Sequence, residues 1–195
     1  MIVVGILGDI GSGKSFISKQ FNCPVFNADY EVNKIYNKSK HCYKLLKNCL
    51  PEHIKSYPVE KKELTKAILT NKYNLKKIVN IVHPFVRKKM NIFLKKNFKK
   101  KMVILDIPLL IENNLNKKKD ILIFIDSKKT EINLRLKKRK NYNKKLINNL
   151  KKLQKTPTYK RKLSAYIIKN DFKPLTIKKR VKFIKKKILN ERNYT

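Results

Sequence analysis

The segment Gly8–Ser15 constrains this chain more than any other. It reads GDIGSGKS and fits the pattern Gly-x4-Gly-Lys-Ser. The apolar run over residues 2–7 predicts a buried strand before it, and residues 16–21 predict the first turns of a helix after it. Strand, glycine-rich turn and helix form the context of a phosphate-binding P-loop. We therefore expect a nucleoside triphosphate site, and the fit of both pattern and context disfavours the alternative of a chance glycine-rich turn.

Each residue type in this loop has a physical role. Glycines let the backbone curl so that N–H groups face phosphate oxygens, and the helix N-terminus adds partial positive charge. Lys14 is expected to reach the β- and γ-phosphates, and the Ser15 hydroxyl to hold Mg²⁺. The phosphate-binding residues predicted here are Gly11, Ser12, Gly13, Lys14 and Ser15.

The rest of the chain predicts an α/β fold with a parallel sheet, because apolar runs alternate with amphipathic stretches. Further strands are expected over 24–27, 102–106, 121–126 and 165–169. Helices are expected over 30–50, 60–69, 74–82, 84–98, 130–138, 143–154 and 174–189. We expect His83-Pro84 to end one helix and Pro84 to begin the next. A single domain over 1–195 follows, with a core (1–29, 100–130, 164–195), a helical subdomain (about 30–99) and a lid (about 131–163).

The net charge of +37 suggests a nucleic-acid or membrane partner. However, only six of the fifty basic residues are Arg, the lysines are spread over nearly every predicted helix, and Asn and Ile are abundant. This composition is typical of a bias toward A/T-rich codons. We therefore predict no specific nucleic-acid partner, although nonspecific adhesion to polyanions at low salt is expected. An ATP-dependent nucleic-acid-binding protein remains the alternative that charge alone supports.

We expect a cytoplasmic protein, and a monomer or weak oligomer. No apolar run approaches the roughly 20 residues that span a bilayer, and the apolar N-terminal stretch runs straight into the glycine-rich loop, which indicates a strand and not a signal peptide. Cys23, Cys42 and Cys49 form no C-x-x-C pair, which is typical of reduced thiols. His41 and His53 lie near two of them, but the spacing fits no familiar zinc pattern.

Two carboxylates follow predicted strands, at the sheet edge where α/β proteins place their sites. Asp29 is a candidate general base, with a helix N-cap as the alternative. Asp106 has the form of a Walker B aspartate that holds Mg²⁺ directly or through water, with a turn before Pro108 as the alternative.

Arginines and one histidine complete the candidate site. Arg135 and Arg139 lie four residues apart on one predicted helix, and a guanidinium suits bidentate phosphate contact. They fit a mobile lid, or alternatively a solvated helix face. Arg87 is a candidate for gripping an anionic substrate, whereas His83 fits equally a functional role and a helix-terminus or core histidine.

Together these segments resemble the dephospho-coenzyme A kinase family, which catalyses the last step of coenzyme A biosynthesis. The resemblance runs along the chain, and its most specific part is Pro-Leu-Leu-x-Glu after a His-Pro segment. The matching segments are Gly8–Ser15, Phe26–Asp29, His83–Arg87, Asp106–Glu112, Arg135–Arg139, Gln154 and Ser164–Asn170.

The resemblance implies that ATP phosphorylates the ribose 3′-hydroxyl of dephospho-CoA, with Mg²⁺, on a P-loop kinase fold with a helical CoA-binding subdomain and a lid. Asp29 would be the general base, and Lys14 and Arg139 would stabilise the transferring phosphoryl group. Phe16 and Arg135 would join the ATP site. The substrate-binding residues would be Asp29, His83, Arg87, Pro108, Leu109 and Glu112. A kinase of the same fold for another hydroxyl or a nucleoside monophosphate is the alternative.

Three positions depart from the family pattern. Asn27 stands in place of the first Asp of the Asp-Ala-Asp turn, so one carboxylate is lost while Asp29 remains. Ala165 stands where an Asp is frequent, which puts a nucleotide contact there in doubt. Asp9 lies inside the phosphate loop, and we expect its side chain to point outward to solvent or a lysine.

Overall fold

The computed structural model describes residues 1–140 and 142–191. Residue 141, in the predicted lid, and residues 192–195, in the predicted core, lie outside the described residues. The chain divides into two compact units. The first comprises Met1–Asn27, Asn97–Tyr142 and Leu153–Thr195, and the second comprises Ala28–Lys96 and Asn143–Lys152.

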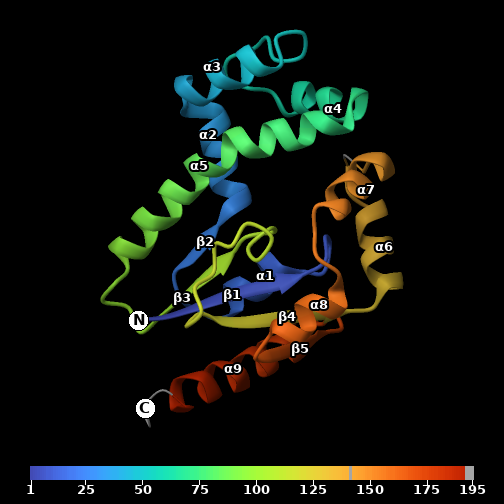
Figure 1. Ribbon diagram of the computed structural model, residues 1–195. Helices are drawn as coiled ribbons and strands as arrows, with labels where there is room; N and C mark the ends of the chain where they lie inside the picture. The colour runs from blue at the N-terminus through green and yellow to red at the C-terminus, as the bar shows by residue number, and fades with distance from the viewer. Residues whose placement is uncertain (141, 192–195) are drawn as a thin grey trace. The chain divides into compact units, whose positions relative to one another are not determined.

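The first unit is built on a five-stranded sheet in the order β2-β3-β1-β4-β5 (Figure 1). The strands are β1 (Ile2–Gly8), β2 (Val25–Asn27), β3 (Met102–Asp106), β4 (Ile121–Ser127) and β5 (Tyr166–Asn170). Every neighbouring pair is parallel. The central strands are buried on both faces, which explains their unbroken apolar runs. The predicted α/β class with a parallel sheet is therefore confirmed.

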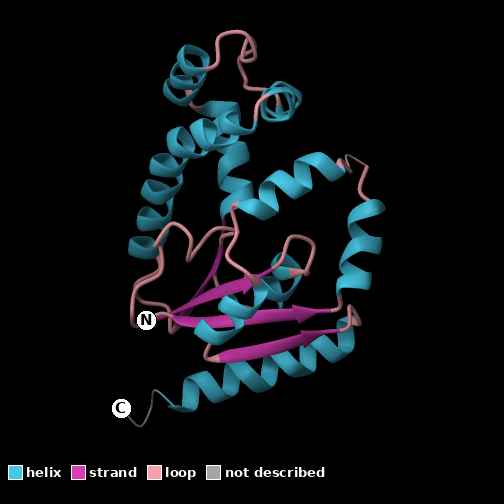
Figure 2. Ribbon diagram, turned by 45° about the vertical axis from the view of Figure 1, so that its right-hand side comes forward, coloured by secondary structure: helices cyan, strands magenta, loops and turns pink. Residues whose placement is uncertain are grey.

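Different elements cover the two faces of this sheet (Figure 2). Helices α1 (Lys14–Gln20) and α9 (Pro174–Glu191) pack on one face, where Ile17, Phe21 and Val181 join alternate residues of the strands in one core. On the other face, a Cβ on Gly5 would lie 2.4 Å from the side chain of Leu110 in the loop after β3. Helix α8 (Pro157–Leu163) contacts β1 and β4.

Helix α8 is absent from the elements that the sequence predicted. Its start carries a local signal, because the Thr156 hydroxyl accepts a hydrogen bond from the backbone N–H of Tyr159, and Pro157 opens the first turn.

Helix α6 (Lys129–Lys137) lies earlier in the chain, after β4. Since α6 ends at Lys137, Arg139 lies just beyond the helix, and the prediction that it shares a helix face with Arg135 is wrong.

The second unit consists of helices. These are α2 (Ala28–Lys38), α3 (Lys40–Cys49), α4 (Lys61–Thr70), α5 (Lys72–Lys96) and α7 (Lys144–Lys152). Helix α5 contacts α2, α3 and α4, and α4 contacts α7. The predicted helix over 30–50 is two helices, because the chain turns at Ser39, whose hydroxyl caps α3 by accepting from the N–H of Cys42.

The predicted break at His83-Pro84 is also wrong, because α5 runs through Pro84 without interruption. A proline inside a helix removes one backbone hydrogen bond and crowds the preceding turn. Val82 and Val86 are buried on either side of it, so burial of the same apolar stripe offsets that cost. In Figure 1 the ribbon of α5 bends part-way along its length, as expected for an internal proline.

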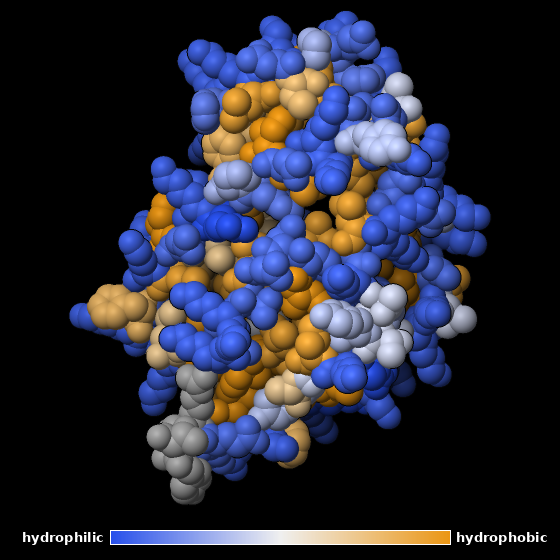
Figure 3. Space-filling view, in the orientation of Figure 1, coloured by the Kyte–Doolittle hydropathy of each residue, from blue (hydrophilic) through white to orange (hydrophobic). Residues whose placement is uncertain are grey.

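Figure 3 shows hydrophilic side chains across the visible face, with smaller apolar patches between them. No helix in the described part of the chain is long and apolar enough to cross a membrane.

The residues around Cys42 form packing contacts. The ring of His41 lies 5.7 Å from that of Phe85, and burial raises the pKa of the Cys42 thiol to about 11. Across residues 1–140 and 142–191, no group of three or more His, Cys, Asp or Glu side chains is placed to hold a metal ion.

Candidate active site

The phosphate-binding loop follows β1 and ends at the N-terminus of α1, as predicted. Gly11 and Gly13 have φ angles of 88° and 86°, in the left-handed region that favours glycine. A Cβ on Gly11 would lie 3.0 Å from the side chain of Leu136 in α6, and one on Gly13 would lie 2.6 Å from the amide of Asn170. These two glycines are therefore required by both backbone conformation and close packing.

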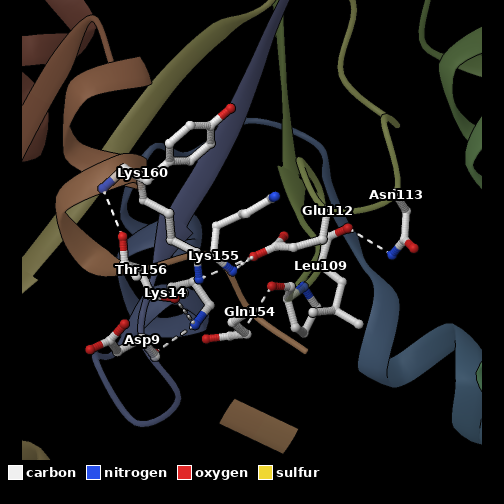
Figure 4. A network of polar contacts seen from close by, with 12 residues as sticks. Asp9, Lys14, Leu109, Glu112, Asn113, Gln154, Lys155, Thr156 and Lys160 are labelled. Atoms are coloured by element: carbon white, nitrogen blue, oxygen red, sulfur yellow. Dashed lines mark hydrogen bonds and ion pairs between the residues drawn. The ribbon is translucent and has the colours of Figure 1, made fainter. Parts of the chain in front are cut away.

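The Lys14 ammonium lies over the start of this loop. Its Nζ donates hydrogen bonds to the carbonyl oxygens of Gly8 at 3.0 Å and Asp9 at 2.8 Å (Figure 4). The exposed Ser15 and Phe16 follow it in the first turn of α1. A cation, a helix N-terminus and an exposed hydroxyl side chain thus follow one another along this segment, which is what binding a phosphate chain requires.

The Ser12 carbonyl is fixed by side chains from two strand ends. Asn170 at the end of β5 donates its amide to this oxygen at 2.7 Å, and the Ser127 hydroxyl at the end of β4 donates at 3.0 Å. Asn170 is buried, and its Oδ1 accepts from the N–H of Phe172 at 2.8 Å. These bonds hold the loop carbonyl in place, which helps to keep the loop N–H groups available for phosphate. Sequence reasoning did not predict this role, although a polar residue ending each strand is a visible signal.

Arg135 of α6 stacks on an aromatic ring next to the loop. Its guanidinium carbon lies 4.5 Å from the centre of the Phe172 ring. Phe172 has a φ angle of 59°, which is unusual for a bulky residue. The sequence predicted Arg135 as an ATP-binding residue but did not identify Phe172. Arg139 is exposed beyond the end of α6.

The two strand-end carboxylates have different settings. Asp106 is buried at the end of β3, and its Oδ2 accepts a hydrogen bond from the amide of Asn27 at 2.6 Å. Asp29 is exposed and lies in the first turn of α2, just after β2. Since α2 already begins at Ala28, Asp29 lies inside the helix and is not its N-cap.

His83 and Arg87 lie one turn apart on α5. His83 is half-buried, and burial, together with the positive charge of Arg87, lowers the pKa of its imidazole. A neutral ring at neutral pH follows. Arg87 is exposed. The structure places both in the second unit.

The segment 108–112 is held by the chain that follows α7 (Figure 4). The Gln154 amide donates to the Pro108 carbonyl at 3.0 Å, and the N–H of Lys155 donates to Oε1 of Glu112 at 2.8 Å. Lys160 Nζ lies 3.5 Å from the same oxygen. Lys160 was not predicted as a site residue, because nothing in the sequence distinguishes it from the surrounding lysines.

Asp9 lines a pocket of about 360 Å³ beside the loop, together with Lys129, Asp126 and Arg161. Arg161 pairs with Asp126 at 2.6 Å. Figure 4 shows the Asp9 carboxylate directed away from the Lys14 ammonium. The side chain is half-buried, and its charge is turned away from the cation that the phosphates need.

Comparison with known proteins identifies the family of this chain. The family model described as "Dephospho-CoA kinase" matches residues 2–174. The chain belongs to the dephospho-CoA kinase family. The match spans every motif of the candidate site, from the phosphate loop to Asn170, and it confirms the resemblance found in the sequence. Dephospho-CoA kinases are transferases.

Individual relatives support the assignment to the dephospho-CoA kinase family. The chain is 31% identical over 172 residues to the dephospho-CoA kinase of Wolbachia sp. subsp. Brugia malayi, which covers 86% of this chain and 88% of that protein. A crystal structure from Thermus thermophilus has a TM-score of 0.75 at 23% identity and covers 97% of both chains. The dephospho-CoA kinase from Campylobacter jejuni has a TM-score of 0.64 at 20% identity over 95% of this chain and 96% of that one. These two structures show the shared fold.

Proposed function

We propose that this chain transfers the γ-phosphoryl group of ATP to the ribose 3′-hydroxyl of dephospho-CoA, which yields coenzyme A and ADP. The observation that carries the proposal is the family match over residues 2–174, which contain a phosphate loop of the required geometry. The remaining roles below are proposals that rest on the residues present.

Asp29 is the proposed general base. Its carboxylate accepts the proton of the 3′-hydroxyl while that oxygen forms a bond to the γ-phosphorus and the bond to the ADP oxygen breaks. The exposure of Asp29 at the start of α2 supports this role, because a base must be reachable by the substrate.

Cationic side chains are proposed to neutralise charge on the transferring group. Lys14 exchanges its hydrogen bonds to the loop carbonyls for hydrogen bonds to phosphate oxygens. Arg139 approaches the phosphates from the region predicted as a lid. Arg135 and Phe16 are proposed to contact ATP. The lid over about 131–163 and the CoA-binding subdomain over about 30–99 remain predictions.

The chain also offers oxygen ligands suitable for Mg²⁺. The Ser15 hydroxyl and the Asp106 carboxylate are hard oxygen donors of the kind that this ion prefers, and one oxygen of Asp106 is already oriented by Asn27. When bound, the ion neutralises charge on the β- and γ-phosphates.

Five residues besides Asp29 are proposed to contact the acceptor substrate. The proposed contacts are His83, Arg87, Pro108, Leu109 and Glu112. The neutral imidazole of His83 favours a hydrogen bond over an ion pair, whereas the exposed Arg87 offers a charge for the substrate phosphates.

The decisive experiment measures ADP release with dephospho-CoA, against a panel of nucleotides, sugars and single-stranded nucleic acid. We expect turnover with dephospho-CoA, and a fall in kcat of about 100-fold or more for Asp29→Asn. Glu31→Gln is the matched control, because it removes a carboxylate from the same first turn of α2.

The alternatives predict different results. Turnover with another hydroxyl acceptor and none with dephospho-CoA would indicate a different kinase of this fold, and stimulation by DNA or RNA would indicate a nucleic-acid-dependent ATPase. Near-normal kcat in Asp29→Asn would refute the base assignment. The cytoplasmic location and the monomeric or weakly oligomeric state stay predictions.

A further inference from the structure

Lys160 differs from every other basic residue in the described part of the chain. Its side chain is 1% exposed, and it is the one Lys or Arg that is buried there. Codon bias explains lysines on the surface, where they cost nothing, but it does not explain an ammonium group within the fold. Burying a charge carries a large desolvation penalty, so this position calls for a specific explanation.

The ammonium faces one partner, the Glu112 carboxylate, whose side chain is 8% exposed. The pairing is incomplete. Over residues 1–140 and 142–191, Lys160 Nζ and Glu112 Oε2 have no hydrogen-bond partner, and the two charged groups are 3.5 Å apart. A buried ion pair with unmade hydrogen bonds contributes little to stability, and apolar residues of the same size often do better. Stability alone therefore does not account for the pair.

The contacts of the pair instead fix the position of the loop segment 108–112. Glu112 Oε1 accepts a hydrogen bond from the N–H of Lys155 at 2.8 Å and forms the ion pair with the Lys160 ammonium. Four residues earlier in the loop, the Pro108 carbonyl accepts a hydrogen bond from the Gln154 amide at 3.0 Å. The two ends of the segment 108–112 are thus fastened to the single stretch 154–160, as Figure 4 shows.

We propose that Lys160 and Gln154 are positioning residues, which hold the segment 108–112 in the geometry that binds the acceptor substrate. Lys160 acts through the Glu112 carboxylate, and Gln154 acts through the Pro108 carbonyl. The proposal rests on the proposed function, because it assigns the segment 108–112 to dephospho-CoA. ATP binding depends on the phosphate loop and is not affected by this anchoring.

The test compares the KM values for the two substrates. We expect Lys160→Met to raise the KM for dephospho-CoA roughly tenfold or more, with the KM for ATP changed less than about twofold. Lys160→Arg, which keeps the charge, is expected to restore most of the affinity. Lys162→Met on the exposed side of α8 is the matched control and is expected to leave both KM values unchanged.

A double-mutant cycle separates positioning from general stability. In the Glu112→Gln background, Lys160→Met is expected to change the KM for dephospho-CoA less than about twofold further, because Lys160 acts through the missing carboxylate. The double variant can also be tested if Lys160→Met alone fails to fold, because the double variant has no unpaired buried carboxylate.

The outcomes distinguish this inference from the proposed function. If the wild type does not phosphorylate dephospho-CoA, the proposed function fails and this inference fails with it. If the wild type is active, the inference alone is overturned by any of three results: an unchanged KM in Lys160→Met, a parallel rise of both KM values, or an undiminished effect in the Glu112→Gln background.

Discussion

The amide of Asn27 donates a 2.6 Å hydrogen bond to the buried carboxylate of Asp106. The two residues are direct neighbours in the parallel pairing of β2 and β3. An aspartate at position 27 would place a second carboxylate at this distance from the first, and like charges so close repel strongly. Asparagine at position 27 therefore forms a charge-assisted hydrogen bond where an aspartate would form a carboxylate pair.

Asn27→Asp is expected to destabilise the protein by about 1–3 kcal/mol at pH 8. Asn27→Ala, which removes the hydrogen bond without adding charge, is the control. Denaturant titrations at pH 8 provide the measurement, and equal free energies of unfolding for the two variants would contradict this expectation.

Asn170→Ala is expected to raise the KM for ATP roughly tenfold, because it removes the shorter hydrogen bond to the Ser12 carbonyl and the bond to the N–H of Phe172. Ser127→Ala removes only the weaker of the two bonds to Ser12 and is expected to have a smaller effect. Steady-state kinetics with ATP varied would show the difference. The loop-fixing role is refuted if the two variants affect the KM for ATP equally, or if neither does.

Stability is expected to fall as the pH drops below about 6.5, in part because of His83. Burial and Arg87 lower the pKa of this imidazole, so the unfolded chain takes up the proton first, and protonation favours unfolding. His83→Gln is expected to lessen this dependence by at most about 1.4 kcal/mol per pH unit. Denaturant unfolding from pH 5 to 8 tests this, with the exposed His41→Gln as control. Identical slopes in wild type and His83→Gln would count against it.

Arg139→Lys is expected to lower kcat by roughly tenfold while the KM for ATP changes little, if this guanidinium contacts the transferring phosphoryl group. The reason is that lysine keeps the positive charge but cannot form the bidentate hydrogen bonds of a guanidinium. Lys137→Met, at the end of α6, controls for a general loss of positive charge in this region. A change confined to the KM for ATP would place Arg139 in binding and not in the chemical step.

The sequence was sufficient wherever the signal is local. The strand before Gly8, the turn and the helix after Gly13 depend on neighbouring residues, and all three form as predicted. The continuity of α5 through Pro84 was missed because burial of Val82 and Val86 in the second unit overrides the local preference for a break.

The contacts that fix the site were not predictable, because they join distant segments. Gln154 and Pro108 are 46 residues apart, and Asn170 and Ser12 are 158 residues apart. Lys160 illustrates the limit, since one buried lysine looks like any other in a chain with fifty basic residues. Only the fold separates it from the rest.

The packing of Gly11 against α6 has a consequence for redesign. Glycine is fixed at position 11 by its φ angle of 88°, so only the helix can adapt, and Leu136 already lies 3.0 Å from where a Cβ would stand. A larger side chain at 136 would press on the phosphate loop, and a smaller one would leave a void beneath it. Nucleotide affinity is therefore expected to depend on the volume of one buried hydrocarbon side chain in α6.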